Sequence, residues 1–462
     1  MQNVSEKKEY RISSINNLKL TFYKIFLPLY KVLALFRRVF SLENLIIILY
    51  FLILFFGRSF TGVYIFGFRL GELIIGGSLV TITYYIFFRG STITSFFGSK
   101  VLLIFRLLFI HFFYITLKSG SLSSFLNPQV FRSSSYIWSL GFIFWLKFFK
   151  KQNIFKLDLF FNLLMVSIPI IFIFSTIYYP SSIQDFFYSY SDKFRLPKGS
   201  DLFLVFSIFL IFIFEKLKDS HKLKIYLFFV LGTFIPLIFY ASRGAAIGTI
   251  ILCTFLFLNS RSIFLKNYKF LLLYSIIFFS TLIISSIYLD TTELDLGEIH
   301  PKEALNSVET TLVTKRFEER NLPFFFIDNN RLVSGDGNLN WRLQIWQDVI
   351  QDLKSKKKLL NGYGYSDNIP AMEKIDRKGL DGTNIHVHNY FVNIFARGGL
   401  VQLILFLSFY LILLKKLYLN YVTKKFFYFV LAVLVVSFFD SSMESVRFPF
   451  LFYTTLSYSL KS

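Results

Sequence analysis

Residues 223–259 read LKIYLFFVLGTFIPLIFYASRGAAIGTIILCTFLFLN, an almost unbroken run of apolar residues. It is far longer than one membrane-spanning helix, which needs about 20 apolar residues. The polar residues Ser242-Arg243-Gly244 interrupt it near its middle. We therefore predict two spans, 223–240 and 244–259, joined by a short turn that places Arg243 at the membrane surface.

The rest of the chain is apolar in the same way. Hydrophobic residues make up 54% of its 462 residues, and 63 residues are phenylalanine. A water-soluble domain has no room to bury so many rings, whereas a bilayer accommodates them. We predict an all-α, polytopic integral membrane protein with about twelve spans, at 40–57, 72–88, 101–117, 134–149, 158–179, 201–215, 223–240, 244–259, 268–289, 390–414, 425–440 and 446–460.

Basic residues orient these spans. The formal net charge is +22, and lysine and arginine gather at the N-terminus and in every second short loop. Cytoplasmic loops carry this excess of positive charge, so both termini are predicted to be cytoplasmic. The charge suits anionic lipid headgroups. With no RNP signature and no zinc-ligand spacing, nucleic acid is not an expected partner.

Four regions follow from this count: a basic cytoplasmic N-terminus (1–39), nine spans (40–289), a large external loop (290–389) and three final spans (390–462). Within the first region, residues 20–38 predict an amphipathic helix lying at the membrane interface. Cys253 is the only cysteine, so a disulfide within the chain and a cysteine-based metal site are both excluded.

The external loop is long enough to have a function of its own. Its segment 339–355 places Trp341, Ile345 and Val349 at helical spacing, which predicts an amphipathic helix lying on the membrane or capping the bundle. The loop ends with His386-Val-His388-Asn389, and the paired Gly398-Gly399 follow inside the next span. Such glycines allow a helix to break or a neighbour to approach closely.

Three polar segments thus fall on the external side: the turn at Arg243, the large loop, and the turn Asp440-Ser-Ser-Met-Glu444-Ser-Val-Arg447. We expect them to meet there and to form a site.

The order of these motifs resembles the O-antigen ligase and O-antigen polymerase superfamily over roughly residues 220–415. The resembling residues are Ser242-Arg243-Gly244-Ala245, Arg342 with Trp346, Gly362-Tyr-Gly364, His388-Asn389, and Gly399-Leu400. The family often has a second glycine three residues later, where this chain has Gln402. Arg397 beside the glycines is also atypical.

The resemblance implies a C-type glycosyltransferase-like fold in the bacterial cytoplasmic membrane. It implies transfer of a glycan from a polyprenyl pyrophosphate, such as undecaprenyl pyrophosphate, to a hydroxyl of another glycan or of a lipid A core. Such an enzyme needs no metal or other cofactor. Arginines suit the leaving pyrophosphate, and a histidine can orient the hydroxyl or take its proton. The predicted catalytic residues are His388 and Arg243, and the predicted substrate-binding residues are Arg342, Asn389, Arg397 and His386.

Two other classes of function compete with this interpretation. A polysaccharide or small-anion transporter would be expected to show internal repeats and paired broken helices, which the sequence lacks. A non-catalytic scaffold of an envelope-polysaccharide complex would tolerate substitution of the same residues. The sequence leaves open whether the chain acts as polymerase or ligase.

Overall fold

The computed structural model describes residues 42–119, 125, 127–148, 158–176, 180–191, 197–217, 220–265, 268–291, 325–328, 330–374, 377, 386–420 and 423–460. The chain divides into two compact units, residues 1–52 and 53–462. In the first unit the structure describes only the beginning of helix α2 (Leu42–Thr61). The interfacial helix predicted at 20–38 lies outside the described residues.

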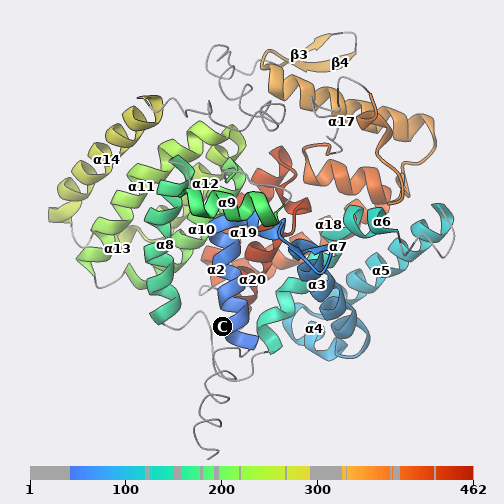
Figure 1. Ribbon diagram of the computed structural model, residues 1–462, viewed down its shortest axis with the longest axis horizontal. Helices are drawn as coiled ribbons and strands as arrows, with labels where there is room; N and C mark the ends of the chain where they lie inside the picture. Colours follow the sequence, from blue (N-terminus) through green and yellow to red (C-terminus); the bar gives the residue numbers. More distant parts are fainter. Residues whose placement is uncertain are drawn as a thin grey trace, which may run out of the picture. The chain divides into compact units, whose positions relative to one another are not determined.

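Helices dominate the second unit (Figure 1). Its first half contains β1 (Tyr64–Ile65), β2 (Phe68–Arg69), α3 (Leu70–Phe87), α4 (Gly90–Phe97), α5 (Ser99–Ser119), α6 (Pro128–Ser133), α7 (Ser135–Trp138), the 3-10 helix η2 (Ser139–Phe148), α8 (Asp158–Thr176), α9 (Ser181–Tyr190) and α10 (Gly199–Lys216). Its second half contains α11 (His221–Ala241), α12 (Arg243–Asn259), α13 (Arg261–Leu265), η5 (Tyr268–Phe270), α14 (Leu271–Thr291), β3 (Phe325–Asp328), β4 (Arg331–Ser334), α17 (Gly337–Ser355), η7 (Pro370–Met372), α18 (Tyr390–Leu419), α19 (Lys424–Phe439), η10 (Ser442–Glu444) and α20 (Arg447–Ser459). Each strand pair is an antiparallel hairpin, with Tyr64 opposite Arg69 and Phe325 opposite Ser334.

Seven of the described helices are long and apolar enough to cross a membrane, namely α2, α3, α5, α8, α11, α14 and α18. The chain is therefore a mainly helical, polytopic membrane protein. Helices also lie at the other five predicted spans. Four of these segments are shorter, and α10 carries Asp201, Glu215 and Lys216. The total of twelve spans stays a prediction.

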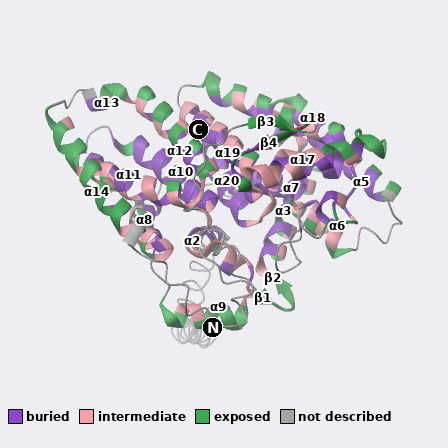
Figure 2. Ribbon diagram, turned by 90° about the horizontal axis from the view of Figure 1, so that it is seen from above, coloured by how far each residue is buried: buried purple, intermediate pink, exposed green. Residues whose placement is uncertain are grey.

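Helices α10 and α20 form the interior of the second unit (Figure 2). Nearly every residue of α10 up to Phe214 is buried, and so is every residue of α20. Only 11% of the apolar stretch of α14 is buried, so α14 presents most of its surface to the surroundings. A helix that is apolar on all sides is stable when other helices enclose it. Arg447 of α20 and Asp201 of α10 form an ion pair in this interior. Nε of Arg447 lies 2.9 and 3.0 Å from the two carboxylate oxygens of Asp201.

Helix α18 is broken at Gly399, which has φ 65° and ψ −167°. The segment 359–364 fills the break. The N–H groups of Tyr363 and Gly364 donate to the carbonyls of Ala396 (2.8 Å) and Arg397 (3.0 Å). The protein thereby satisfies backbone groups that lipid cannot. The helix break that the paired glycines predicted is present.

Glycine is required on both sides of this contact. A Cβ at Gly399 would collide with the carbonyl oxygen of Leu360, and a Cβ at Gly362 would lie 2.5 Å from the carbonyl oxygen of Arg397. Both glycines also have positive φ, which other residues adopt only at a cost.

Candidate functional site

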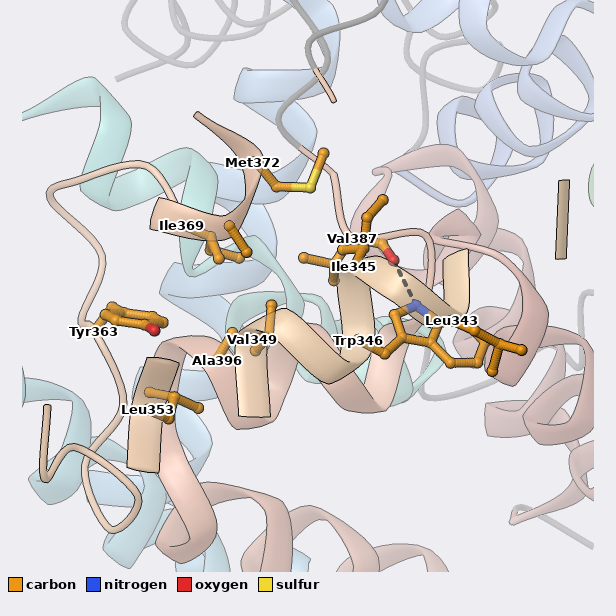
Figure 3. Close-up of a cluster of buried hydrophobic side chains, with 11 residues drawn as sticks. Leu343, Ile345, Trp346, Val349, Leu353, Tyr363, Ile369, Met372, Val387 and Ala396 are labelled. Atoms are coloured by element: carbon orange, nitrogen blue, oxygen red, sulfur yellow. Dashed lines mark hydrogen bonds between the residues drawn. The ribbon is translucent and has the colours of Figure 1, made fainter. Parts of the chain in front are cut away.

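Helix α17 packs its apolar face against the first turns of α18 and the segment before it (Figure 3). The buried side chains of this contact are Leu343, Ile345, Trp346, Val349, Leu353, Tyr363, Ile369, Ala371, Met372, Val387 and Ala396. The indole N–H of Trp346 donates to the carbonyl of Val387 at 2.8 Å. The amphipathic helix that the sequence predicted at 339–355 is present as α17, and its apolar face is buried in this contact. The contact fixes the backbone between His386 and His388.

The three polar segments that the sequence singled out meet at this end of the bundle. Arg243, in the first turn of α12, forms an ion pair with Asp336, the N-cap residue of α17. The guanidinium of Arg342 donates to the backbone carbonyl of Phe439 at the end of α19. One contact thus joins the Arg243 turn to the loop, and the other joins the loop to the C-terminal turn.

His388 lies beside the first turns of α17. It has φ 53°, and its ring centroid is 5.2 Å from that of Trp341. Burial lowers the pKa of His388 well below its ordinary value, and the cations of Arg342 and Lys198 act in the same direction. A protonated imidazole would be repelled by both cations. The ring is therefore neutral near neutral pH, and it can donate one hydrogen bond and accept another.

Asp440 completes this group of charges. It interacts electrostatically with Lys198, Arg342 and His388. We call these four residues the His388 cluster. Two cations beside one carboxylate leave an excess of positive charge, which suits an anionic group such as a phosphate.

Asn389 and Arg397 lie inside the structure, behind the His388 cluster. Asn389 is fully buried and caps α18, because its Oδ1 accepts from the N–H groups of Phe391 (2.9 Å) and Val392 (3.0 Å). Arg397 is 4% exposed and donates to the carbonyls of Gly364, at 3.2 Å, and of Asp367. Asn389 thus holds the backbone that follows His388, and Arg397 holds the backbone at residues 364–367. Their predicted contacts with substrate stay a prediction.

Gln402 occupies the position where the family often has a second glycine, and it is accommodated because its side chain forms buried hydrogen bonds. Its side chain is fully buried, its Nε2 donates to the hydroxyl of Tyr365 at 2.5 Å, and its Oε1 accepts from the hydroxyl of Tyr136 at 2.6 Å. A glycine there would leave these two buried hydroxyls without these hydrogen bonds. The glutamine thus cross-links α7, the segment before η7, and α18.

An apolar pocket lies between α2, α8, α10 and α20. Its walls include Phe56, Leu202 and Leu451, and Arg58, Lys198, Asp201 and Arg447 also line it. Lys198 belongs to this pocket and to the His388 cluster. The cavity volume of this pocket is about 40 Å³, which is too small for a lipid chain.

Sequence reasoning missed two residues of this region, Lys198 and Asp336. Asp440 and Glu444 lie in the polar turn that the sequence singled out, with the role of each residue left open. Asp336 follows the N-cap pattern of α17, since its Oδ1 accepts from the N–H of Leu339 at 2.8 Å. No local pattern indicated Lys198, because its place depends on the packing of α10.

Comparison with known proteins bears on this arrangement directly. A model of the family described as O-antigen ligase matches residues 227–407. A search of curated proteins finds no match for the chain. The matched segment contains all six residues that the sequence proposed for the site: Arg243, Arg342, His386, His388, Asn389 and Arg397. Residues 227–407 are therefore a domain of the O-antigen ligase family.

Proposed function

We propose that this protein transfers a glycan from a polyprenyl pyrophosphate to an acceptor hydroxyl at the end of the bundle that α17 caps. The observation that carries the proposal is the His388 cluster, in which the imidazole of His388 interacts with the cations Arg342 and Lys198, and in which His388 and Arg342 belong to the segment matched by the O-antigen ligase family. We assign this end to the external side of the bacterial cytoplasmic membrane, following the distribution of basic loops.

The pyrophosphate of the donor fits the His388 cluster, where Lys198 and Arg342 supply positive charge. Arg342 and Arg243 would stabilise the charge that develops on the leaving pyrophosphate, because guanidinium groups bind phosphate oxygens with two hydrogen bonds. Arg243 is 56% exposed, so it can exchange Asp336 for a phosphate.

The reaction is a substitution at the anomeric carbon. The acceptor oxygen forms a bond to that carbon, and the bond from the carbon to the phosphate oxygen breaks. Polyprenyl pyrophosphate leaves with the electron pair, and the hydroxyl proton passes to a base. His388 lies where it can orient the hydroxyl or take this proton. Positioning both substrates at one depth of the membrane supplies much of the rate.

The test is the envelope glycan profile of cells that lack the gene and carry wild type, Arg243→Ala or His388→Ala at equal expression. We expect both variants to lose product by at least about 10²-fold, since each removes a group that acts in the transition state. Loss of the long-chain ladder, with single repeats remaining, identifies a polymerase. Loss of all attached glycan, with lipid-linked polymer accumulating, identifies a ligase. Full rescue by both variants would rule out the transferase and favour a transporter or a scaffold.

A further inference from the structure

A second histidine of the same segment forms a pair with a buried carboxylate. Nδ1 of His386 lies 3.1 Å from Oε2 of Glu444. The His386 side chain is 49% exposed, whereas that of Glu444 is 9% exposed. The backbone carbonyl of Glu444 accepts from the hydroxyl of Ser135 at 3.2 Å, which ties this turn to α7. The accessible imidazole of His386 is thus paired with the buried carboxylate of Glu444, and the hydrogen bond from Ser135 fixes the backbone of Glu444.

We infer that His386, oriented by Glu444, is the base that takes the acceptor hydroxyl proton, and that His388 stays neutral and orients the substrates. This inference rests on the proposed function and deepens it by separating the roles of the two histidines. The separation rests on what surrounds each ring. His386 is paired directly with the Glu444 carboxylate, whereas His388 interacts with two cations, Lys198 and Arg342, as well as with the Asp440 carboxylate.

A carboxylate on one ring nitrogen prepares a histidine to accept a proton on the other. With Nδ1–H donating to Glu444, the lone pair of the neutral ring is on Nε2. Taking up a proton then creates an imidazolium next to a negative charge, which stabilises it. The same event at His388 would create a third positive charge in a cluster where Asp440 is the single carboxylate beside Lys198 and Arg342. By this electrostatic argument His386 is the better base.

Glu444 is more than a counter-ion, because its environment is unusual. Its Oε1 is buried and has no hydrogen-bond partner among the described residues. Burial raises the pKa of Glu444 above its ordinary value, while His386 and Arg397 act against the rise and Asp440 adds to it. A neutral glutamine therefore suits this position structurally, so Glu444→Gln is expected to fold and to remove only the charge. Glu444 is a positioning residue, and His386 is the group that touches the reacting proton.

The step balances as follows. The acceptor oxygen bonds to the anomeric carbon as its proton moves to Nε2 of His386. The carbon–oxygen bond to phosphate breaks, and polyprenyl pyrophosphate takes its electron pair. The imidazolium, stabilised by Glu444, then returns its proton to water. No oxidant, reductant or further reactant takes part.

The experiment measures release of polyprenyl pyrophosphate by the full chain in liposomes. The donor probe is the lipid-linked glycan extracted from cells that lack the gene, supplied alone or with lipid A core. Initial rates are recorded against pH for wild type, His386→Gln, Glu444→Gln and Glu444→Asp. His221→Gln, a histidine that pairs with Tyr274 outside this site, is the matched control. Glu373→Gln, on the exposed part of the loop, is the control for the carboxylate.

We expect His386→Gln to lower kcat by about 10²-fold or more with little change in KM, as loss of a general base does. The wild-type rate should fall on acidification as the general base takes up a proton, and this limb should disappear in His386→Gln. The groups that face this pair and His388 are Arg342, Arg397, Lys198 and Asp440. Glu444→Gln should lower kcat and shift the acidic limb to lower pH. Glu444→Asp should restore part of the rate, and both controls should match wild type.

Two results would overturn the inference while leaving the proposed function intact. One is a wild-type rate and pH profile in His386→Gln. The other is a folded Glu444→Gln whose rate and pH profile equal those of wild type. No release by the wild-type protein with either acceptor would instead contradict the proposed function itself.

Discussion

At the scale of single residues, His388 links the stability of the protein to pH. Because its folded-state pKa is lowered, the unfolded chain takes up a proton at this residue under conditions where the folded chain does not. The contribution to stability is therefore complete above the ordinary histidine pKa of about 6.5 and is lost as the pH falls below it. The loss reaches at most about 1.4 kcal/mol per pH unit.

We accordingly expect His388→Gln to make the melting temperature less sensitive to acid. Thermal unfolding in detergent between about pH 7.5 and 5.5 measures this, since an ordinary histidine titrates in that range. Ser355→Ala, which removes no titratable group, should keep the wild-type drop. An equal drop in His388→Gln would mean that this imidazole does not resist protonation in the folded protein.

At the scale of elements, the break in α18 depends on one backbone conformation. Gly399→Ala should destabilise the protein, because alanine at positive φ costs about 1–3 kcal/mol and its Cβ would also collide with the Leu360 carbonyl. Gly76→Ala is the matched control: it lies within α3, and a Cβ there meets nothing within 4 Å. The control should melt at or slightly above the wild-type temperature, since alanine favours a helix by up to about 1 kcal/mol over glycine. The melting temperature and the monodisperse fraction after extraction report both effects, and equal values for the two variants would contradict the account of the break.

The elements also show how far sequence reasoning reached. Hydropathy located the helices, and helical spacing with paired tryptophans located α17, because burial of one face follows directly from periodicity. The glycines predicted the break in α18 through their backbone freedom. Neither the helical spacing nor the glycines indicate which segments far apart in the chain lie close together in the fold. The pairing of His386 with Glu444 and the approach of Lys198 to His388 arise from the packing of α10, α17 and α18, so only the structure reveals them.

At the scale of the whole molecule, the sidedness of the bundle is the feature that function requires. We predict that α17 is external and that the far end of α18 is cytoplasmic. In a chain with Cys253→Ala, a cysteine introduced at exposed Ser355 should react with a membrane-impermeant maleimide in spheroplasts. A cysteine introduced at exposed Lys415 should react only after the membrane is permeabilised. Labelling of Lys415→Cys before permeabilisation would reverse the assigned orientation.

The site extends beyond the segment that matches the family model. Residues 227–407 carry the arginines and histidines, but Lys198, Asp440 and Glu444 come from helices and turns on either side of the match. Substitutions in these flanking segments can alter the charge around the two histidines while the matched segment stays recognisable. Chimeras that exchange only these flanking segments are therefore expected to change the charge around the two histidines while residues 227–407 keep their match to the family.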